Sequence, residues 1–204
     1  MGVTGRAAGG RRRVAAGVAA TVVLGLAAAC ASDPPAARKA LSTVEATVGA
    51  AVGVSPSPSS TEDGQVPEGV NLSPFDTGAA AVRNLDPALL AALRKAAGDA
   101  KAQGVEMSVT SGWRSKAYQQ RLLDKAVAKY GSLEQARRFV NTPEKSAHVS
   151  GKAVDVGATA ADYWMIQHGA RYGLCQVYAN EIWHFELLTT AGGTCPAPLP
   201  DAAG

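Results

Sequence analysis

Histidine, cysteine and aromatic residues are scarce in this sequence of 204 residues. It contains three histidines and three cysteines, and aromatic residues make up only 5% of the chain. Much of the apolar content is alanine, so we expect a modest hydrophobic core in one domain with extensions. A lone histidine is more often a surface or core residue than a ligand, and we interpret His168 in this way. The other two histidines each lie within a distinctive motif.

A strong net charge is also absent. The formal net charge is +3, but Arg6, Arg11, Arg12 and Arg13 all precede residue 30, where there is no aspartate or glutamate. Removing these four charges leaves −1 on the remainder. A nearly neutral protein has no electrostatic basis for binding nucleic acid, so we exclude nucleic acid as a partner.

Residues 1–30 have the pattern of an export signal. Three arginines at 11–13 precede an apolar run that is too short to serve comfortably as a permanent membrane anchor. Three alanines then precede Cys30, and two interpretations stay open: an ordinary cleaved signal peptide, or a lipoprotein with a lipid on Cys30. Both place the protein outside the cytoplasmic membrane or in the cell wall, and only the second gives it a membrane anchor.

The remainder divides into a tether, a domain and a tail. Residues 31–71 are rich in serine, proline and alanine, and such a segment buries too little apolar surface to offset its ordering entropy. We therefore predict a disordered tether there, a single folded domain over 72–197 and a flexible tail over 198–204. We expect the protein to be a monomer.

Helix and strand signals alternate within the domain. An Asp-Pro pair at residue 86 begins a helix that Gly104 ends, and residues 105–110 then alternate as in a strand with one buried face. Ser115 caps a second helix that Gly131 ends. Further elements are expected as a short helix through 139, a strand at 152–156, a helix at 162–172, and strands at 174–178 and 182–187. This order predicts an α+β fold, with a small, largely antiparallel sheet flanked by helices.

Two short motifs contain the candidate chemistry. Residues 146–155 read SAHVSGKAVD and residues 181–184 read EIWH. They supply the imidazoles of His148 and His184 and the carboxylates of Asp155 and Glu181. Two imidazoles and one carboxylate suffice to hold a catalytic zinc with one position open for water, and another carboxylate can act as general base. Because strand residues three apart face opposite sides, the EIWH segment must bend or bulge.

The complete Ser-x-His-x-x-Gly-x-Ala-x-Asp pattern, followed by Glu-x-x-His, is similar to that of the zinc D-alanyl-D-alanine carboxypeptidases of the VanY type. These are bacterial cell-wall peptidases. The resemblance includes SGWRS at 111–115 and Tyr-Gln at 118–119, and it covers roughly residues 72–195. The chain departs from the usual family pattern at Ile182, where proline is common, and at Ala147, where glutamate is frequent. Neither position is a ligand in the family.

The resemblance implies roles for particular residues. One zinc ion would be held by His148, Asp155 and His184, with Glu181 as the base. The arginine of SGWRS lies in the family's active site, and a guanidinium suits a substrate carboxylate or a developing oxyanion, so Arg114 is both a catalytic and a substrate-binding candidate. Three further side chains are candidate substrate contacts: Ser146, Tyr118 and Gln119.

The implied activity is hydrolysis of peptidoglycan stem peptides, with removal of a terminal D-Ala. Two alternatives use the same metal machinery: a cell-wall endopeptidase and an L,D-carboxypeptidase. Two others differ in class: a non-haem iron oxygenase, which shares the donor set, and a non-catalytic wall-binding module. The base Glu181 argues against both, and a structural zinc would normally have four protein ligands.

Cys175 and Cys195 remain after the signal segment is set aside. An exported protein can keep such a pair oxidised, so we predict a disulfide between them. The rival interpretation is a catalytic thiol. It is disfavoured because neither cysteine has a neighbouring histidine or basic residue that would lower its pKa.

Overall fold

The computed structural model describes residues 61–204. The predicted export signal, Cys30 and the tether up to residue 60 lie outside the described residues. Across 61–204, none of the helices combines the length and apolar character needed to cross a membrane.

A four-stranded sheet forms the centre of the domain. The strands lie in the order β1-β2-β4-β3, and each pair of neighbouring strands is antiparallel. The strands are β1 (Ser108–Ser111), β2 (Ala153–Gly157), β3 (Leu174–Tyr178) and β4 (Glu181–Leu187). The α+β class predicted from the order of elements is confirmed.

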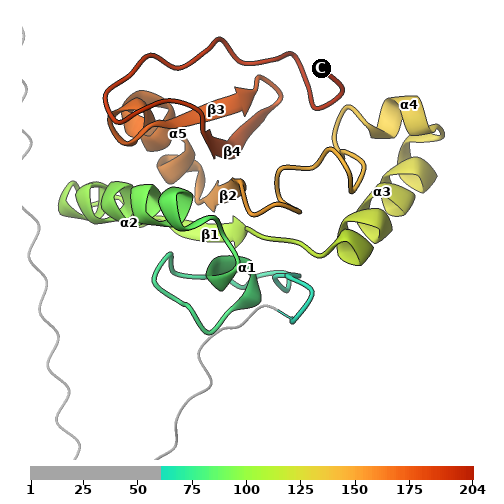
Figure 1. Ribbon diagram of the computed structural model, residues 1–204, viewed down its shortest axis with the longest axis horizontal. Helices are drawn as coiled ribbons and strands as arrows, with labels where there is room; N and C mark the ends of the chain where they lie inside the picture. Colours follow the sequence, from blue (N-terminus) through green and yellow to red (C-terminus); the bar gives the residue numbers. More distant parts are fainter. Residues whose placement is uncertain (1–60) are drawn as a thin grey trace, which may run out of the picture. The chain divides into compact units, whose positions relative to one another are not determined.

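The helices are α1 (Ala80–Arg83), α2 (Pro87–Ala102), α3 (Lys116–Tyr130), α4 (Leu133–Ala136), α5 (Thr159–His168) and the 3-10 helix η1 (Gly169–Tyr172). Figure 1 shows α2 and α5 beside the sheet at its left, and α3 and α4 apart from the sheet at the right. The main core joins α2 and α5 to the sheet, with Leu93, Met165, Val154 and Phe185 among its buried members. A second, smaller cluster lies between α3 and α4, around Leu123. The core is therefore concentrated on one face of the sheet.

Local signals account for the ends of several helices. The Asp86 side chain accepts hydrogen bonds from two backbone N–H groups at the start of α2. The Ser115 hydroxyl oxygen accepts one at the start of α3, and Gly131 ends that helix with a φ of 83°. These caps satisfy backbone groups that have no partner within the helix.

Two elements begin elsewhere than predicted. The strand expected from Val105 begins at Ser108, because the Val105 N–H donates to the Ala100 carbonyl and closes the end of α2 instead. The helix expected from Asp162 begins at Thr159, after an N-cap residue, Ala158, that provides no side-chain hydrogen bond. A helix start without a polar cap has no local signature in the sequence.

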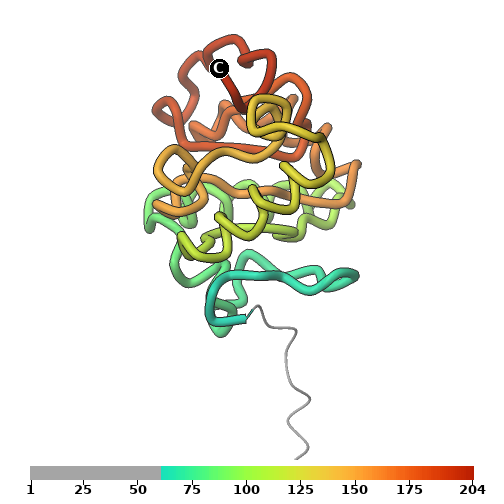
Figure 2. The backbone as a smooth tube through the Cα atoms, turned by 90° about the vertical axis from the view of Figure 1, so that its right-hand side faces the viewer, coloured from blue at the N-terminus to red at the C-terminus, as the bar shows by residue number. Residues whose placement is uncertain are grey.

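Both ends of the described chain differ from the predicted domain limits. Residues 61–71 were assigned to the tether, yet the Ser115 N–H donates to the Asp63 carbonyl at 2.9 Å, and Asp63 forms an ion pair with Arg121. The predicted tail over 198–204 also contacts the domain, through a backbone pairing of Leu199 with β3. Backbone hydrogen bonds and ion pairs hold both segments, and Val66 and Val70 also pack against the main core. A few such contacts leave no pattern in a sequence rich in serine, proline and alanine. Figure 2 shows them at opposite ends of the domain.

The predicted disulfide between Cys175 and Cys195 is present, with the two Cα atoms 5.6 Å apart. It closes a loop with a sequence separation of 20 residues. We expect replacement of both cysteines by alanine to lower the free energy of unfolding by about 3 kcal/mol, because the open chain gains entropy when unfolded. Chemical denaturation of oxidised wild-type and variant proteins would measure this. A difference below about 1 kcal/mol would contradict the entropic account.

Candidate metal centre and active site

The pairing of β2 with β4 places two predicted ligands side by side. Asp155 is directly opposite His184 in the ladder, and the neighbouring pair is Val154 with Phe185. Val154 and Phe185 are fully buried in the main core. Since side chains alternate along a strand, Asp155 and His184 point to the opposite face. There the Asp155 Oδ1 lies 3.0 Å from the His184 Nδ1.

His148 reaches the same point from the loop that precedes β2. Its Nδ1 donates to the Gly112 carbonyl at 2.8 Å, which directs Nε2 towards the other two ligands. The loop turns at Gly151, where φ is +71° and an added Cβ would lie 2.5 Å from the Asn84 carbonyl oxygen. Only glycine fits such a close approach at this φ.

The three side chains fit a zinc ion. The donor atoms of His148, Asp155 and His184 are 3.0, 3.2 and 3.4 Å apart in pairs. Donors about 2.0–2.2 Å from a tetrahedral zinc would be about 3.3–3.6 Å apart. All three residues are buried, and among the described residues theirs is the only group of this kind that could hold a metal. Two nitrogens and one carboxylate leave a fourth position for water or substrate.

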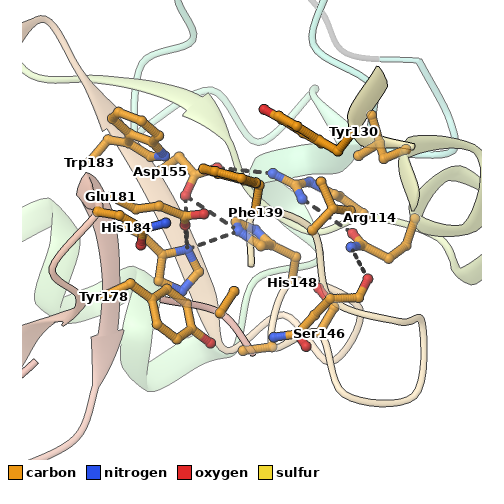
Figure 3. Close-up of a pocket in the computed structure, with 17 residues that line it drawn as sticks. Arg114, Tyr130, Phe139, Ser146, His148, Asp155, Tyr178, Glu181, Trp183 and His184 are labelled. Atoms are coloured by element: carbon orange, nitrogen blue, oxygen red, sulfur yellow. Dashed lines mark hydrogen bonds and ion pairs between the residues drawn. The ribbon is translucent and has the colours of Figure 1, made fainter. Parts of the chain in front are cut away.

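Glu181 lies beside this cluster because β4 bulges. Residues 182–184 stand opposite the single residue Val177 of β3, so the register shifts between Glu181 and His184. Both residues are therefore buried on the same side, with the Glu181 Oε2 3.8 Å from the His184 Nδ1. Burial raises the pKa of Glu181 to about 7, against the opposing effect of His184. The bend predicted from the spacing of the motif is confirmed. Figure 3 shows the four side chains converging.

The charges and pKa shifts in the cluster favour binding of a cation. Burial lowers the pKa of His184, but hydrogen bonds with Asp155 and Glu186 outweigh burial and raise it to about 9. Burial would also raise the pKa of Asp155, yet His148 and its other partners hold that pKa well below its usual range. The pKa of His148 itself is lowered, mainly by burial. An anionic carboxylate between two imidazoles is the arrangement that a cation requires.

Arg114 contacts the other oxygen of the same carboxylate. Its Nη2 donates to the Asp155 Oδ2 at 2.9 Å, its Nε to the Ser111 hydroxyl at 2.9 Å, and its Nη1 to the Gln119 Oε1 at 3.2 Å. The arginine side chain lines the cleft and is 14% exposed. Arg114 therefore orients a predicted ligand and also faces the space where a substrate would lie.

The structure separates the three weaker substrate candidates. Ser146 lines the cleft, as expected. Gln119 also borders it, but it is 1% exposed and uses its amide to link Arg114 to the Asn141 carbonyl, so it supports the arginine instead. Tyr118 is not among the lining residues, and its ring packs under the Arg121 guanidinium. Tyr118 and Gln119 thus lie in the first turn of α3, and neither side chain is available to contact a substrate in the cleft.

The cleft has a volume of about 490 Å³ and lies between the sheet and the segment around α3 and α4. Tyr130 and Phe139 stack with ring centroids 4.6 Å apart on one wall. Trp183 lies on the opposite wall of the cleft and is 42% exposed. The sequence motifs did not identify these residues, because isolated aromatic residues have no pattern that places them at a cleft.

Sequence reasoning also missed Glu186. Its Oε1 lies 3.2 Å from the His184 Nε2, on the side of the ring away from the ligand atom. A signal was available, because Glu186 is two residues beyond His184 on one strand and so shares its face. A carboxylate at this position fixes the orientation of a ligating imidazole.

We expect the Glu186→Gln substitution to weaken zinc binding by about 10- to 100-fold, because the imidazole loses its charged partner. Competition titration with a chromogenic chelator would measure the zinc affinity. Glu106→Gln is a matched control, since Glu106 is exposed and pairs with Lys101 far from the site. Equal affinities for the two variants would show that Glu186 does not position His184.

Comparison with known proteins identifies the family of this chain. Residues 82–188 match the family described as "VanY: D-alanyl-D-alanine carboxypeptidase", and the chain belongs to this family. The matched residues include all three ligands, Glu181 and Arg114. The resemblance expected from the motifs is confirmed.

Individual relatives are more distant. A D-alanyl-D-alanine carboxypeptidase of Enterococcus faecalis is 28% identical over 120 residues, which are 47% of this chain and 45% of that protein. The chain thus spans less than half the length of this curated relative. Among solved structures, the LdcB LD-carboxypeptidase is similar with a TM-score of 0.50 and 24% identity, over 64% of this chain and 70% of that one. A vancomycin resistance D,D-pentapeptidase VanY in complex with Zn(II) has a TM-score of 0.48 and 26% identity, over 51% and 72%.

Proposed function

We propose that this protein is a zinc-dependent peptidase that hydrolyses peptidoglycan stem peptides and removes a terminal D-Ala. The observation that carries the proposal is the convergence of His148, Asp155 and His184 on one point of an open cleft, with the Glu181 carboxylate beside them. The family match supports the class of substrate, and the Enterococcus faecalis relative supports the D-alanyl-D-alanine specificity.

Each of these side chains has a chemical task in such a reaction. The three ligands would hold zinc, which when bound supplies a Lewis acid that acidifies water and polarises a carbonyl. Glu181 accepts a proton from the attacking water and delivers it to the leaving amine. A carboxyl group whose pKa burial raises to about 7 is suited to both steps near neutral pH.

Arg114 provides positive charge where the substrate becomes negative. Its guanidinium is fixed by Ser111, Gln119 and Asp155, so little reorganisation is needed when an oxyanion or a terminal carboxylate approaches. Ser146, also at the cleft, offers a hydroxyl to the peptide. These residues bind and orient the substrate beside the proton acceptor.

The test is incubation of the zinc-loaded domain with a pentapeptide ending in D-Ala-D-Ala, followed by mass analysis. The expected result is loss of one alanine, which a chelator prevents and added zinc restores. A tetrapeptide ending in an L-to-D bond and a cross-linked muropeptide test the L,D-carboxypeptidase and endopeptidase alternatives in the same assay. Absence of cleavage of all three substrates would refute the proposed function and favour a wall-binding role.

We also propose that the protein acts outside the cytoplasmic membrane as a monomer, with a lipid on Cys30 as the alternative to a free exported form. The disulfide supports an oxidising compartment. Mass analysis of the mature protein, purified from its host, would distinguish a lipidated Cys30 from simple signal cleavage.

A further inference from the structure

Residues 195–204, here called the strap, are attached to the outer edge of the sheet. Cys195 is bonded to Cys175 of β3. Further along, the Leu199 N–H donates to the Val177 carbonyl, and the Ala179 N–H donates to the Leu199 carbonyl, both at 2.8 Å. The strap thus begins as a short extension of the sheet beside β3.

The strap then crosses to the segment that follows α4. The Arg138 Nε donates to the Asp201 Oδ2 at 2.6 Å, and the Ala202 N–H donates to the Arg138 carbonyl at 3.3 Å. The Asn180 side chain donates to the same carbonyl at 3.1 Å. Asp201 and Ala202 are only 8% and 9% exposed, whereas the Arg138 side chain is 53% exposed, so the strap residues are packed against the domain and their ion pair lies at its surface.

These two attachment points belong to opposite walls of the cleft. Tyr178 and Asn180, next to the strap on the sheet side, line the cleft, as do Phe139 and Asn141 on the α4 side. Ala202 lines it as well. Figure 1 shows the strap passing from β3 towards the segment after α4. The strap and the Asn180 side chain therefore join the two walls at this end of the cleft.

This end of the cleft is close to the candidate metal ligands. The Tyr178 ring lies 5.0 Å, centroid to centroid, from the ring of His184, so a single side chain separates the strap's edge of the cleft from the ligand cluster. A peptide that continues from the cluster in this direction would meet Tyr178 and then the strap. A site that is closed on one side of the reacting bond accepts chain ends and excludes chain interiors.

We propose that the carboxyl side of the cleaved bond faces the strap, and that the strap is a specificity element that limits how far a peptide extends on that side. This inference rests on the proposed peptidase function and explains why that function would be restricted to terminal residues. The walls and the strap exclude longer substrates sterically, whereas the ligands and Glu181 are indifferent to length.

The test compares two substrates and two forms of the protein. The substrates are a pentapeptide ending in D-Ala-D-Ala and the same peptide with two glycines added after the last D-Ala. The forms are the intact chain and a chain that ends at Pro198, which keeps the disulfide. We expect the intact chain to favour the shorter peptide in kcat/KM, and removal of residues 199–204 to reduce this preference by about tenfold or more.

An unchanged preference in a shortened chain that is folded and zinc-loaded would overturn the inference. If the shortened chain does not fold, the Asp201→Ala variant replaces it, because this substitution removes the ion pair with Arg138. The measure is again the ratio of kcat/KM for the shorter peptide to kcat/KM for the longer one. Binding of the two peptides to the Glu181→Ala forms, measured by calorimetry, separates this question from catalysis. Strap-dependent discrimination in binding without any hydrolysis by the wild type would support the strap and refute the peptidase. Equal binding with and without residues 199–204 would refute the strap alone.

Discussion

Replacing Glu181 with alanine should leave zinc binding intact and lower kcat by about 10²- to 10⁴-fold, the range typical of losing a general acid–base group. Glu181 is close to the ligands without being one of them, since its carboxylate lies 3.8 Å from the His184 Nδ1 and outside the group of three donors. The variant should therefore hold one zinc per chain, measured by elemental analysis, while steady-state hydrolysis of the pentapeptide collapses.

Glu144→Ala is the matched control, because Glu144 is exposed and does not line the cleft. It should retain both zinc and activity. A Glu181→Ala protein with near wild-type turnover would remove Glu181 from the mechanism. Loss of zinc in that variant would instead make Glu181 part of the metal site.

Replacing His148 with alanine should abolish stoichiometric zinc binding and, with it, hydrolysis. This substitution removes one of the three protein ligands. The zinc affinity should therefore fall further than for loss of a residue that only supports a ligand, such as Glu186, where a loss of about 10- to 100-fold is expected. The loss also leaves the Gly112 carbonyl without the imidazole that it orients. Zinc titration followed by calorimetry, with activity measured in parallel, would show both effects.

His168→Gln provides the comparison, since it removes the remaining histidine. Its ring lies on α5 against Trp164, with centroids 4.8 Å apart, and is not part of the ligand group. This variant should bind zinc like the wild type. Full zinc occupancy in the His148→Ala protein would mean that the metal site lies elsewhere.

Much of the site followed from short motifs. Residue types gave the set of possible donors, and the spacing of Glu181 and His184 predicted the bulge in β4. The resemblance to the VanY family implied which carboxylate is a ligand and which is the base. Each motif consists of residues close together in the chain. The spacing of Glu181 and His184, for example, is incompatible with a regular strand if both are to face one ion.

Other features depended on contacts between distant segments. Gln119 was expected at the substrate, but the fold places Asn141 beside it and turns its amide into a support for Arg114. Tyr118 was expected in the cleft, yet α3 directs its ring to Arg121. One turn of a helix presents side chains in all directions, and only the packing of that helix decides which of them reach the site.

The sequence by itself determined the fold class, the helix caps, the disulfide pair and the donor set, because each arises from local preferences or from the few residues able to perform the chemistry. Only the tertiary structure decided that Asp155 lies opposite His184, that Glu186 supports the imidazole, and that residues 61–71 and the strap belong to the domain. The pairing register and the docking of segments depend on long-range packing and on single hydrogen bonds, which leave no periodic pattern in the chain.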